Sequence, residues 1–307
     1  MRVSLVFPIF NESACLPVLW DRITAVVASL AYDFELIFVD DGSTDGSFDI
    51  LSAIAAADTR VKLLRFSRNF GHQIAITAGI DVADGDAVIV MDADLQDPPE
   101  LIGEMLAKFE DGMDVVYAVR RDRQGETLFK KLSANVFYKI LNWMSSTPIP
   151  LDTGDFRLMS RRVVAALSTM REQDRFVRGM VSWVGFNQCP VYFDRDPRVA
   201  GQTKYPFRKM VQFALNGIMS FSTVPLRWAS WLGFVLSGAA GIYIIVVVGL
   251  RFTGHTFPGY ASLMIAVLLL GGIQLMTVGI LGGYVGRLVM ESKKRPLYIV
   301  SETVGFE

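Results

Sequence analysis

The sequence has few of the residues that cross-link small secreted domains or bind transition metals. Among 307 residues there are two cysteines, Cys15 and Cys189, and two histidines. Two cysteines so far apart exclude a disulfide-rich scaffold and fit a reducing cytoplasmic compartment. With so few histidines we exclude a histidine-based metal site, and we interpret His72 as a helix-start residue near the ligand pocket.

An excess of one charge and a glycine-rich phosphate loop are also missing. Lys and Arg number 30 against 31 Asp and Glu, for a net charge of −1. This balance argues against a nucleic-acid partner, which needs a basic face. Neither a Walker motif nor a dinucleotide fingerprint follows the first apolar run, which favours diphosphate binding through a metal. That first run, residues 3–7, is too short for a signal peptide and predicts a strand.

Short apolar runs alternate with stretches of helical periodicity in the first half of the chain. This alternation predicts an α/β fold with a mostly parallel sheet covered on both faces. The expected strands are 3–7, 34–39, 61–66, 87–91 and 114–119, and the expected helices are 16–30, 46–57, 72–83 and 126–144.

Acidic residues gather where two of these strands end. Asp40 and Asp41 close one strand, and Asp92, Asp94 and Asp97 follow another. Open α/β sheets bind ligands at the carboxyl ends of their strands. Carboxylates gathered there repel one another unless a cation is present, and Mg²⁺ or Mn²⁺ is the natural partner. The glycine after Asp41 permits close backbone approach.

Two long segments without charged residues follow, at 228–250 and 259–286. The first spans 23 residues, enough at about 1.5 Å per residue to cross a hydrocarbon core of about 30 Å. Basic residues flank the outer ends of the pair, which predicts a transmembrane hairpin with both termini in the cytoplasm. Residues 204–227 are expected to form an interfacial helix, with a core helix as the alternative, and residues 287–307 a cytoplasmic tail. Glycines within 271–286 suggest close helix packing, inside the hairpin or between protomers.

The order of several motifs resembles the family 2 glycosyltransferases of GT-A fold. More narrowly it is similar to the polyprenyl-phosphate glycosyltransferases, and closest to membrane-anchored bacterial bactoprenol glucosyltransferases; dolichyl-phosphate mannose synthase is related. The motifs are Val-Phe-Pro-Ile-Phe-Asn-Glu at 6–12, Phe-Val-Asp-Asp-Gly-Ser at 38–43, Phe-Ser-Arg-Asn-Phe-Gly-His at 66–72, Met-Asp-Ala-Asp-Leu-Gln-Asp-Pro-Pro-Glu at 91–100, Thr-Gly-Asp-Phe-Arg-Leu-Met at 153–159 and Gly-Gln-Thr-Lys-Tyr at 201–205. The resemblance implies a GT-A catalytic domain over residues 1–203.

The resemblance also implies roles for individual residues. Nucleotide-sugar binding is implied for Pro8, Phe10, Asn11, Glu12, Val39, Asp41 and Asp92. Metal and diphosphate binding is implied for Asp92, Asp94 and Gln96. A role at the acceptor or in catalysis is implied for Asp155, Arg120, Lys131, Arg198 and Lys204, and whether Asp155 or another group acts as base stays open.

The implied activity is the inverting transfer of one sugar, first of all glucose from UDP-glucose, to undecaprenyl phosphate on the cytoplasmic face of the inner membrane. GDP-mannose is the alternative donor. The implied partners are a nucleotide sugar, a polyprenyl phosphate, Mg²⁺ or Mn²⁺ and a membrane, with a possible homo-oligomer. A non-catalytic, nucleotide-sensing membrane scaffold is the third interpretation. The implied setting is glycosylation of the cell envelope.

Overall fold

A computed structural model describes residues 1–121, 153–194, 224–252 and 259–306. The predicted site residues Lys131, Arg198 and Lys204 lie outside these ranges, as do the expected helix 126–144 and most of the expected interfacial helix. The chain divides into two compact units. The first holds residues 1–142, 147–206 and 295–307, and the second holds 143–146 and 207–294.

An eight-stranded sheet forms the centre of the first unit, in the order β7-β5-β6-β4-β1-β2-β3-β8. The strands are β1 (Arg2–Ile9), β2 (Asp33–Asp40), β3 (Val61–Phe66), β4 (Ala87–Val90), β5 (Val115–Arg120), β6 (Thr153–Ser160), β7 (Gln188–Phe193) and β8 (Val300–Val304). The first five match the expected strands to within two residues at each end. Their apolar runs reflect burial on both faces, which parallel strands require.

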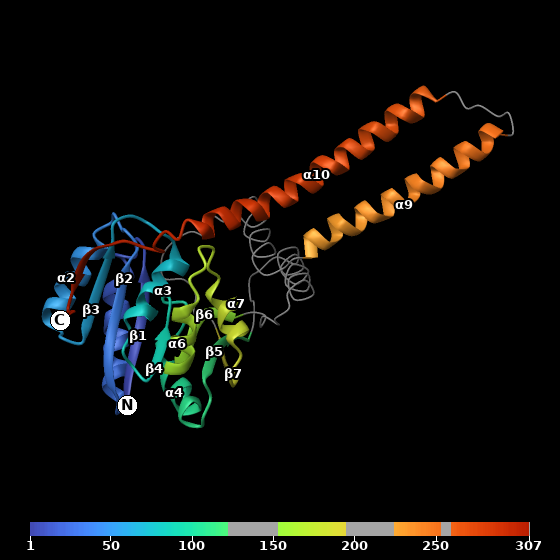
Figure 1. Ribbon diagram of the computed structural model, residues 1–307. Coiled ribbons are helices and arrows are strands. Elements are labelled where there is room, and N and C mark those ends of the chain that lie inside the picture. The colour runs from blue at the N-terminus through green and yellow to red at the C-terminus, as the bar shows by residue number, and fades with distance from the viewer. Residues whose placement is uncertain (122–152, 195–223, 253–258, 307) are drawn as a thin grey trace. The chain divides into compact units, whose positions relative to one another are not determined.

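Helices cover both faces of this sheet (Figure 1). One face packs against α1, α2 and α4, and the other against α3, α6 and α7. The helices are α1 (Leu16–Ser29), α2 (Ser47–Ala57), α3 (His72–Val82), α4 (Ile102–Glu110, after the short helix η1 at Pro99–Leu101), α6 (Arg161–Thr169) and α7 (Val177–Val184). The alternation of side chains along β1 supplies both layers, since Val3, Leu5 and Phe7 lie in one core and Val6 in the other.

The sheet is mixed, which refines the expectation of a mostly parallel one. Strands β4, β1, β2 and β3 are parallel neighbours, as alternating β and α units predict. However, β6 runs antiparallel to both β4 and β5, and β8 runs antiparallel to β3. Both reversed strands come from sequence with many polar residues, TGDFRLMS and VSETV, so the search for apolar runs missed them.

The segment after the second long helix, which we expected to be a tail, contributes a strand to the sheet. Helix α10 continues to Ser292, and residues 300–304 then add β8 to the edge of the sheet beside β3. In Figure 1 the C-terminus accordingly lies beside β3 and α2. Residues 295–307 therefore belong to the first unit, together with the N-terminal half of the chain.

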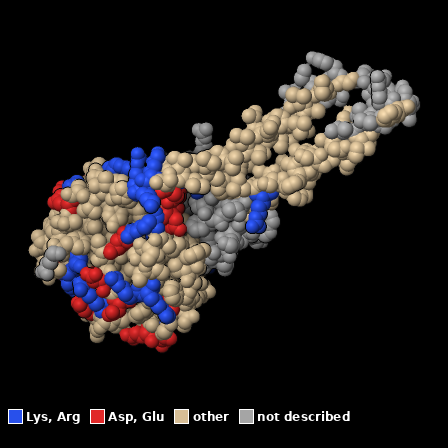
Figure 2. Space-filling view, viewed as in Figure 1, with Lys and Arg blue, Asp and Glu red and all other residues tan. Residues whose placement is uncertain are grey.

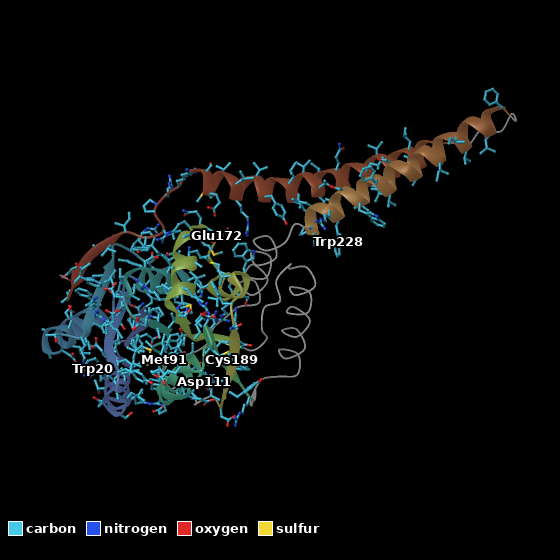
Figure 3. The ribbon with its side chains drawn as sticks, turned by 60° about the horizontal axis from the view of Figure 1, so that its bottom comes forward. Trp20, Met91, Asp111, Glu172, Cys189 and Trp228 are labelled. Carbon is cyan, nitrogen blue, oxygen red and sulfur yellow. The ribbon has the colours of Figure 1, made fainter. Side chains whose placement is uncertain are left out.

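Two long helices make up the described part of the second unit, α9 (Val224–Phe252) and α10 (Tyr260–Ser292). Figure 2 shows their surface almost free of Lys, Arg, Asp and Glu, and Figure 3 shows side chains projecting outward along both helices from Trp228 onward. Among the described residues one stretch, Leu269–Ser292, is long and apolar enough to cross a membrane, with a mean hydropathy of 1.5 and none of it buried.

The glycines of α10 do not mark close packing among the described atoms. A Cβ added at Gly271, Gly272, Gly279, Gly282 or Gly286 would meet no described atom within 4 Å. Close packing at these glycines, inside the hairpin or between protomers, stays a prediction.

Candidate active site

The carboxyl ends of β1, β2 and β4 meet at one edge of the sheet. Ile9 pairs with Asp40, and Val6 with Val90, so the residues that follow each strand emerge side by side. The acidic clusters at 40–41 and 92–97 therefore share an edge with the turn at 10–12, as expected for the ligand edge of an α/β sheet.

The turn after β1 is joined to the turn after β2 by Asn11. This residue has a left-handed backbone (φ 56°), which asparagine tolerates better than most residues. Its N–H donates to Ser43 Oγ at 3.0 Å, and its Oδ1 accepts from the Thr44 N–H at 2.9 Å. Next to it Phe10 is 46% exposed, whereas Pro8 and Val39 are buried in their strands. Of these predicted nucleotide contacts, Phe10 thus presents its side chain at the surface.

Asp41 ties the turn after β2 to the loop between β3 and α3. Its buried carboxylate accepts from the Phe70 N–H at 2.6 Å and from the Gly71 N–H at 2.9 Å. Burial raises the pKa of Asp41, and these two amides offset only part of that effect. The same loop crosses closely over Gly42 (φ 72°), where an added Cβ would lie 2.8 Å from Arg68 C and Asn69 N. The absence of a side chain at Gly42 thus allows the protein's own backbone to pass close to this turn.

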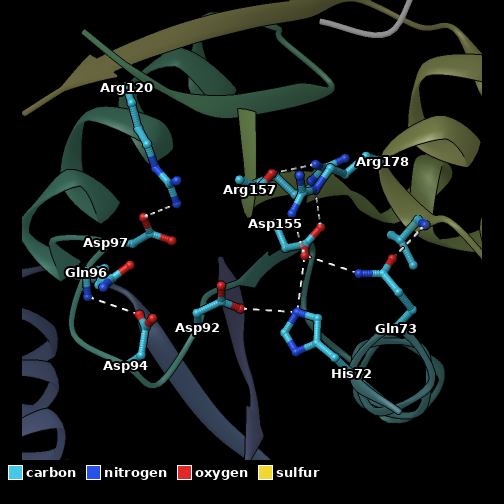
Figure 4. A network of polar contacts seen from close by, with 12 residues as sticks. His72, Gln73, Asp92, Asp94, Gln96, Asp97, Arg120, Asp155, Arg157 and Arg178 are labelled. Atoms are coloured by element: carbon cyan, nitrogen blue, oxygen red, sulfur yellow. Dashed lines mark hydrogen bonds and ion pairs between the residues drawn. The ribbon is translucent and has the colours of Figure 1, made fainter. Parts of the chain in front are cut away.

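The second acidic cluster lies on the loop after β4 (Figure 4). Asp94 Oδ1 accepts from the Gln96 N–H at 3.1 Å. Asp97 is buried, and Arg120 at the end of β5 reaches it at 3.6 Å. Asp92 Oδ1 is buried and accepts no hydrogen bond from the residues that the structure describes, and His72 Nε2 lies 3.4 Å from it.

Asp155, near the start of β6, lies at the centre of a network of four side chains (Figure 4). Its Oδ1 accepts from Arg178 Nε at 2.8 Å, and its Oδ2 accepts from Arg178 Nη2 at 3.0 Å and Gln73 Nε2 at 3.2 Å. His72 Nε2 lies 3.1 Å from the same Oδ2. Gln73 Oε1 in turn accepts from the Val177 N–H at 2.9 Å, which ties α7 to α3.

Neighbouring charges give the two aspartates of this site, Asp155 and Asp92, pKa values shifted in opposite directions. Burial opposes the ionisation of Asp155, but the hydrogen bond from His72 and the charge of Arg178 lower its pKa well below the usual range. Burial raises the pKa of Asp92 to about 7; His72 opposes this rise, whereas the charges of Asp155, Asp97 and Asp94 add to it. Asp155 is therefore a stable anion, whereas the pKa of Asp92 is raised although His72 Nε2 lies 3.4 Å from it.

A divalent cation fits the acidic side of the site. His72, Asp92 and Asp155 each offer a ligand atom, and these atoms lie within 4.8 Å of one another. Asp155 is the weakest of the three, because Arg178, Gln73 and His72 already occupy its two oxygens. Asp92 has an oxygen without a hydrogen bond and a pKa raised by neighbouring carboxylates, which is the condition that a bound Mg²⁺ or Mn²⁺ relieves.

The structure brings together part of the predicted set and adds Gln73 and Arg178, which the sequence analysis did not name. Asp92, Asp94, Gln96, Asp155 and Arg120 appear in one close view of the site (Figure 4). Our exclusion of a histidine from the metal site was wrong in its reasoning, because one histidine between two carboxylates forms a candidate cation site regardless of the total count. His72 was placed near the ligand pocket by the sequence analysis, but local sequence gave no signal for Gln73 or Arg178, whose contacts join residues 23 to 104 positions apart.

The chain is similar to several known proteins over nearly its whole length. The chain is 49% identical over 308 residues to an uncharacterized glycosyltransferase, YkcC, of Bacillus subtilis (strain 168), covering 100% of this chain and 95% of the relative. It is 42% identical to a prophage bactoprenol glucosyl transferase homolog of Escherichia coli (strain K12) and 41% identical to a bactoprenol glucosyl transferase of Shigella phage SfV, each over 98% of both chains.

Residues 4–167 match the family described as Glycosyl transferase family 2. They include β1 to β6 and the acidic clusters at 40–41 and 92–97, and the α/β fold with its mixed sheet is of the GT-A-like kind that the resemblance implied. The chain therefore belongs to glycosyltransferase family 2 and is a glycosyltransferase.

Proposed function

We propose that the chain transfers one sugar, with inversion, from a nucleotide sugar to undecaprenyl phosphate at the cytoplasmic face of the membrane. UDP-glucose is the first donor to test and GDP-mannose the second. One observation carries the proposal: the acidic group of Asp92 and Asp94 adjoins a cationic group that includes Arg178 and His72. Such a site suits two anionic substrates, and the similarity to bactoprenol glucosyl transferases supports a polyprenyl phosphate as one of them.

On the donor side, Asp92 and Asp94, with Gln96, would hold Mg²⁺ or Mn²⁺. When bound, the cation neutralises charge on the departing nucleoside diphosphate. Asn11, Glu12 and Asp41 are proposed to bind the nucleoside. The hydrogen bonds of Asn11 and Asp41 already join three turns of this edge, which reduces the ordering that nucleoside binding would require.

On the acceptor side, a phosphate oxygen of the lipid attacks the anomeric carbon while the bond from that carbon to the diphosphate breaks. The attacking oxygen is anionic at neutral pH, so the step needs little help from a base. This fits Asp155, whose oxygens accept hydrogen bonds from Arg178 and Gln73 and whose pKa is depressed. We infer that Asp155 orients Arg178 and His72, and that Arg120 and these cations reduce the repulsion between the two substrates.

The two long helices are proposed to form the transmembrane hairpin expected from the sequence. Leu269–Ser292 of α10 is apolar enough to cross a membrane. The chain leaves the first unit before α9 and rejoins it after α10, where β8 pairs with β3. A single crossing would place β8 and β3 on opposite sides of the bilayer. An even number of crossings avoids this, and we propose α9, which has no charged residue over 228–250, as the second one.

A turnover assay with radiolabelled donors tests the proposal. The full chain in detergent is incubated with undecaprenyl phosphate and UDP-glucose or GDP-mannose, with Mg²⁺, with Mn²⁺, or with EDTA. We expect metal-dependent labelling of the lipid with one of the donors. Transfer that is unaffected by EDTA would contradict the metal assignment. Nucleotide binding without transfer to any lipid would favour the scaffold interpretation.

A further inference from the structure

Residues 295–306, here called the C-terminal clasp, hold the edge of the sheet next to the nucleotide side of the site. Strand β8 pairs with β3 from Leu63 to Phe66. The contact continues past the end of β3, where the Ser67 N–H donates to Ile299 O at 2.9 Å. Ser67 begins the loop 67–71, whose last two amides donate to Asp41. The clasp therefore contacts the first residue of the loop that Asp41 holds at its other end.

Tyr298 is the side chain that joins the clasp to this region. Its ring stacks on Phe66 with centroids 5.2 Å apart and planes 19° apart. Its hydroxyl donates to Asp81 Oδ2 at 3.1 Å, and Arg171 Nη1 binds the same oxygen at 2.7 Å. Burial and the charge of Asp81 raise the pKa of Tyr298 to about 12, so the hydroxyl keeps its proton at neutral pH.

Aromatic contacts continue from Tyr298 into the loop. Phe66 meets Phe70 edge to face at 5.6 Å, and the Phe70 N–H makes the 2.6 Å hydrogen bond to Asp41. Tyr298, Phe66, Phe70 and Asp41 thus form one continuous series of contacts. Chains of packed side chains of this kind carry energetic coupling between sites.

We propose that the clasp is a positioning element for the nucleotide pocket, in which Tyr298 orders the loop 67–71 against Asp41. The ligand whose binding it serves is a nucleoside diphosphate. This inference rests on the proposed function, because that function places the nucleoside at Asp41. It also gives the segment after α10 a part in donor binding, although no residue of the clasp lies near the acidic clusters in sequence.

Hydrogen exchange and nucleotide binding in the full chain test the inference together. The variants are Tyr298→Ala, which removes the ring, and Tyr298→Phe, which keeps the stack and removes the hydroxyl. Tyr32→Ala is a matched control: Tyr32 is also half-buried, contacts the strand residue Phe34 and donates to the carboxylate of Glu110. Amide exchange at Phe70 and Gly71 reports the order of the loop, and calorimetry with UDP and GDP reports the pocket.

We expect Tyr298→Ala to speed exchange at Phe70 and Gly71 about three- to tenfold and to weaken nucleotide binding by a similar factor, the range of one aromatic contact. Tyr298→Phe should stay within about twofold of the wild type because it keeps that contact. Unchanged exchange at Phe70 and Gly71 in Tyr298→Ala overturns the inference. It is also overturned if Tyr32→Ala speeds exchange at these amides as much, or if Tyr298→Ala speeds exchange but leaves the nucleotide affinity unchanged. A wild-type chain that binds neither UDP nor GDP overturns the proposed function, whereas the exchange data still decide whether the clasp orders the loop.

Discussion

Replacing Arg178 by alanine should reduce both stability and turnover, because Arg178 supplies two of the hydrogen bonds to a buried anion. Asp155 is 3% exposed, and Arg178 binds both of its oxygens, at 2.8 and 3.0 Å. Removing one partner of a buried ion pair costs about 3–5 kcal/mol. Two features reduce this figure here: the Arg178 side chain is 27% exposed, and Gln73 and His72 remain bonded to Asp155. We therefore expect a loss of about 2–3 kcal/mol.

Urea unfolding of the full chain in detergent measures this loss, and the transfer assay measures turnover, which should fall about 100-fold if the acceptor is misplaced. The double variant Asp155→Asn with Arg178→Ala completes a thermodynamic cycle. Because each single change already removes the contact between the two side chains, the double variant should be more stable than the sum of the two losses predicts, by about 1–3 kcal/mol.

A second buried aspartate supplies the control for this prediction. Arg162 pairs with Asp114 in the same manner, away from the acidic clusters, and its side chain is 59% exposed. Arg162→Ala should cost less stability and leave turnover unchanged. The role assigned to Arg178 and Asp155 would be refuted if their losses of stability were additive in the double variant. It would also be refuted if Arg162→Ala lost as much turnover as Arg178→Ala.

Three further predictions follow from other parts of the chain. Asp94→Ala should lower metal-dependent transfer at least about 100-fold with the melting temperature unchanged, and activity within about tenfold of the wild type would contradict its role. Burial raises the pKa of Glu35, but hydrogen bonds from Ser4, the Asp84 amide and Lys62 outweigh it and hold the pKa below its ordinary 4.5. The stability that Glu35 contributes is thus present above that pH and lost as pH falls through the folded-state pKa, and Glu35→Gln should flatten that part of an acid unfolding curve. Replacing residues 228–286 by a polar linker, with residues 287–307 kept because β8 completes the sheet, should preserve nucleotide binding, reduce transfer to undecaprenyl phosphate steeply and spare a short, water-soluble prenyl phosphate. Equal losses on both acceptors would show that the hairpin does not present the lipid.

The sequence was sufficient for the parts of the fold where local pattern and burial coincide. Strands β1 to β4 are mostly buried and rich in apolar residues, and Asp92 and Asp94 follow the wholly apolar strand β4. Strand β6 could not be found in this way. It carries buried Asp155 and Arg157, whose charges are balanced by neighbours that come together only in the folded chain.

The candidate site shows the same division between local and long-range information. Asp155 was predicted from a motif, but its partners Gln73 and Arg178 come from helices on other parts of the chain, α3 and α7. Nothing in the local sequence distinguishes Arg178 from a surface arginine. Strand β8 was missed because an edge strand with exposed polar residues has the composition of a loop.

The position of β8 in the chain also has a consequence for biosynthesis. Chains fold from the N-terminus during translation, and strands β1 to β7 are complete before either long helix has been made. The edge of β3 must then stay unpaired until α9 and α10 have been synthesised, because its partner β8 follows them. An open strand edge is a template for wrong pairing. The last step in completing this sheet therefore comes after both long helices have been synthesised, so a chain that stops or is cut before residue 300 keeps an exposed strand edge.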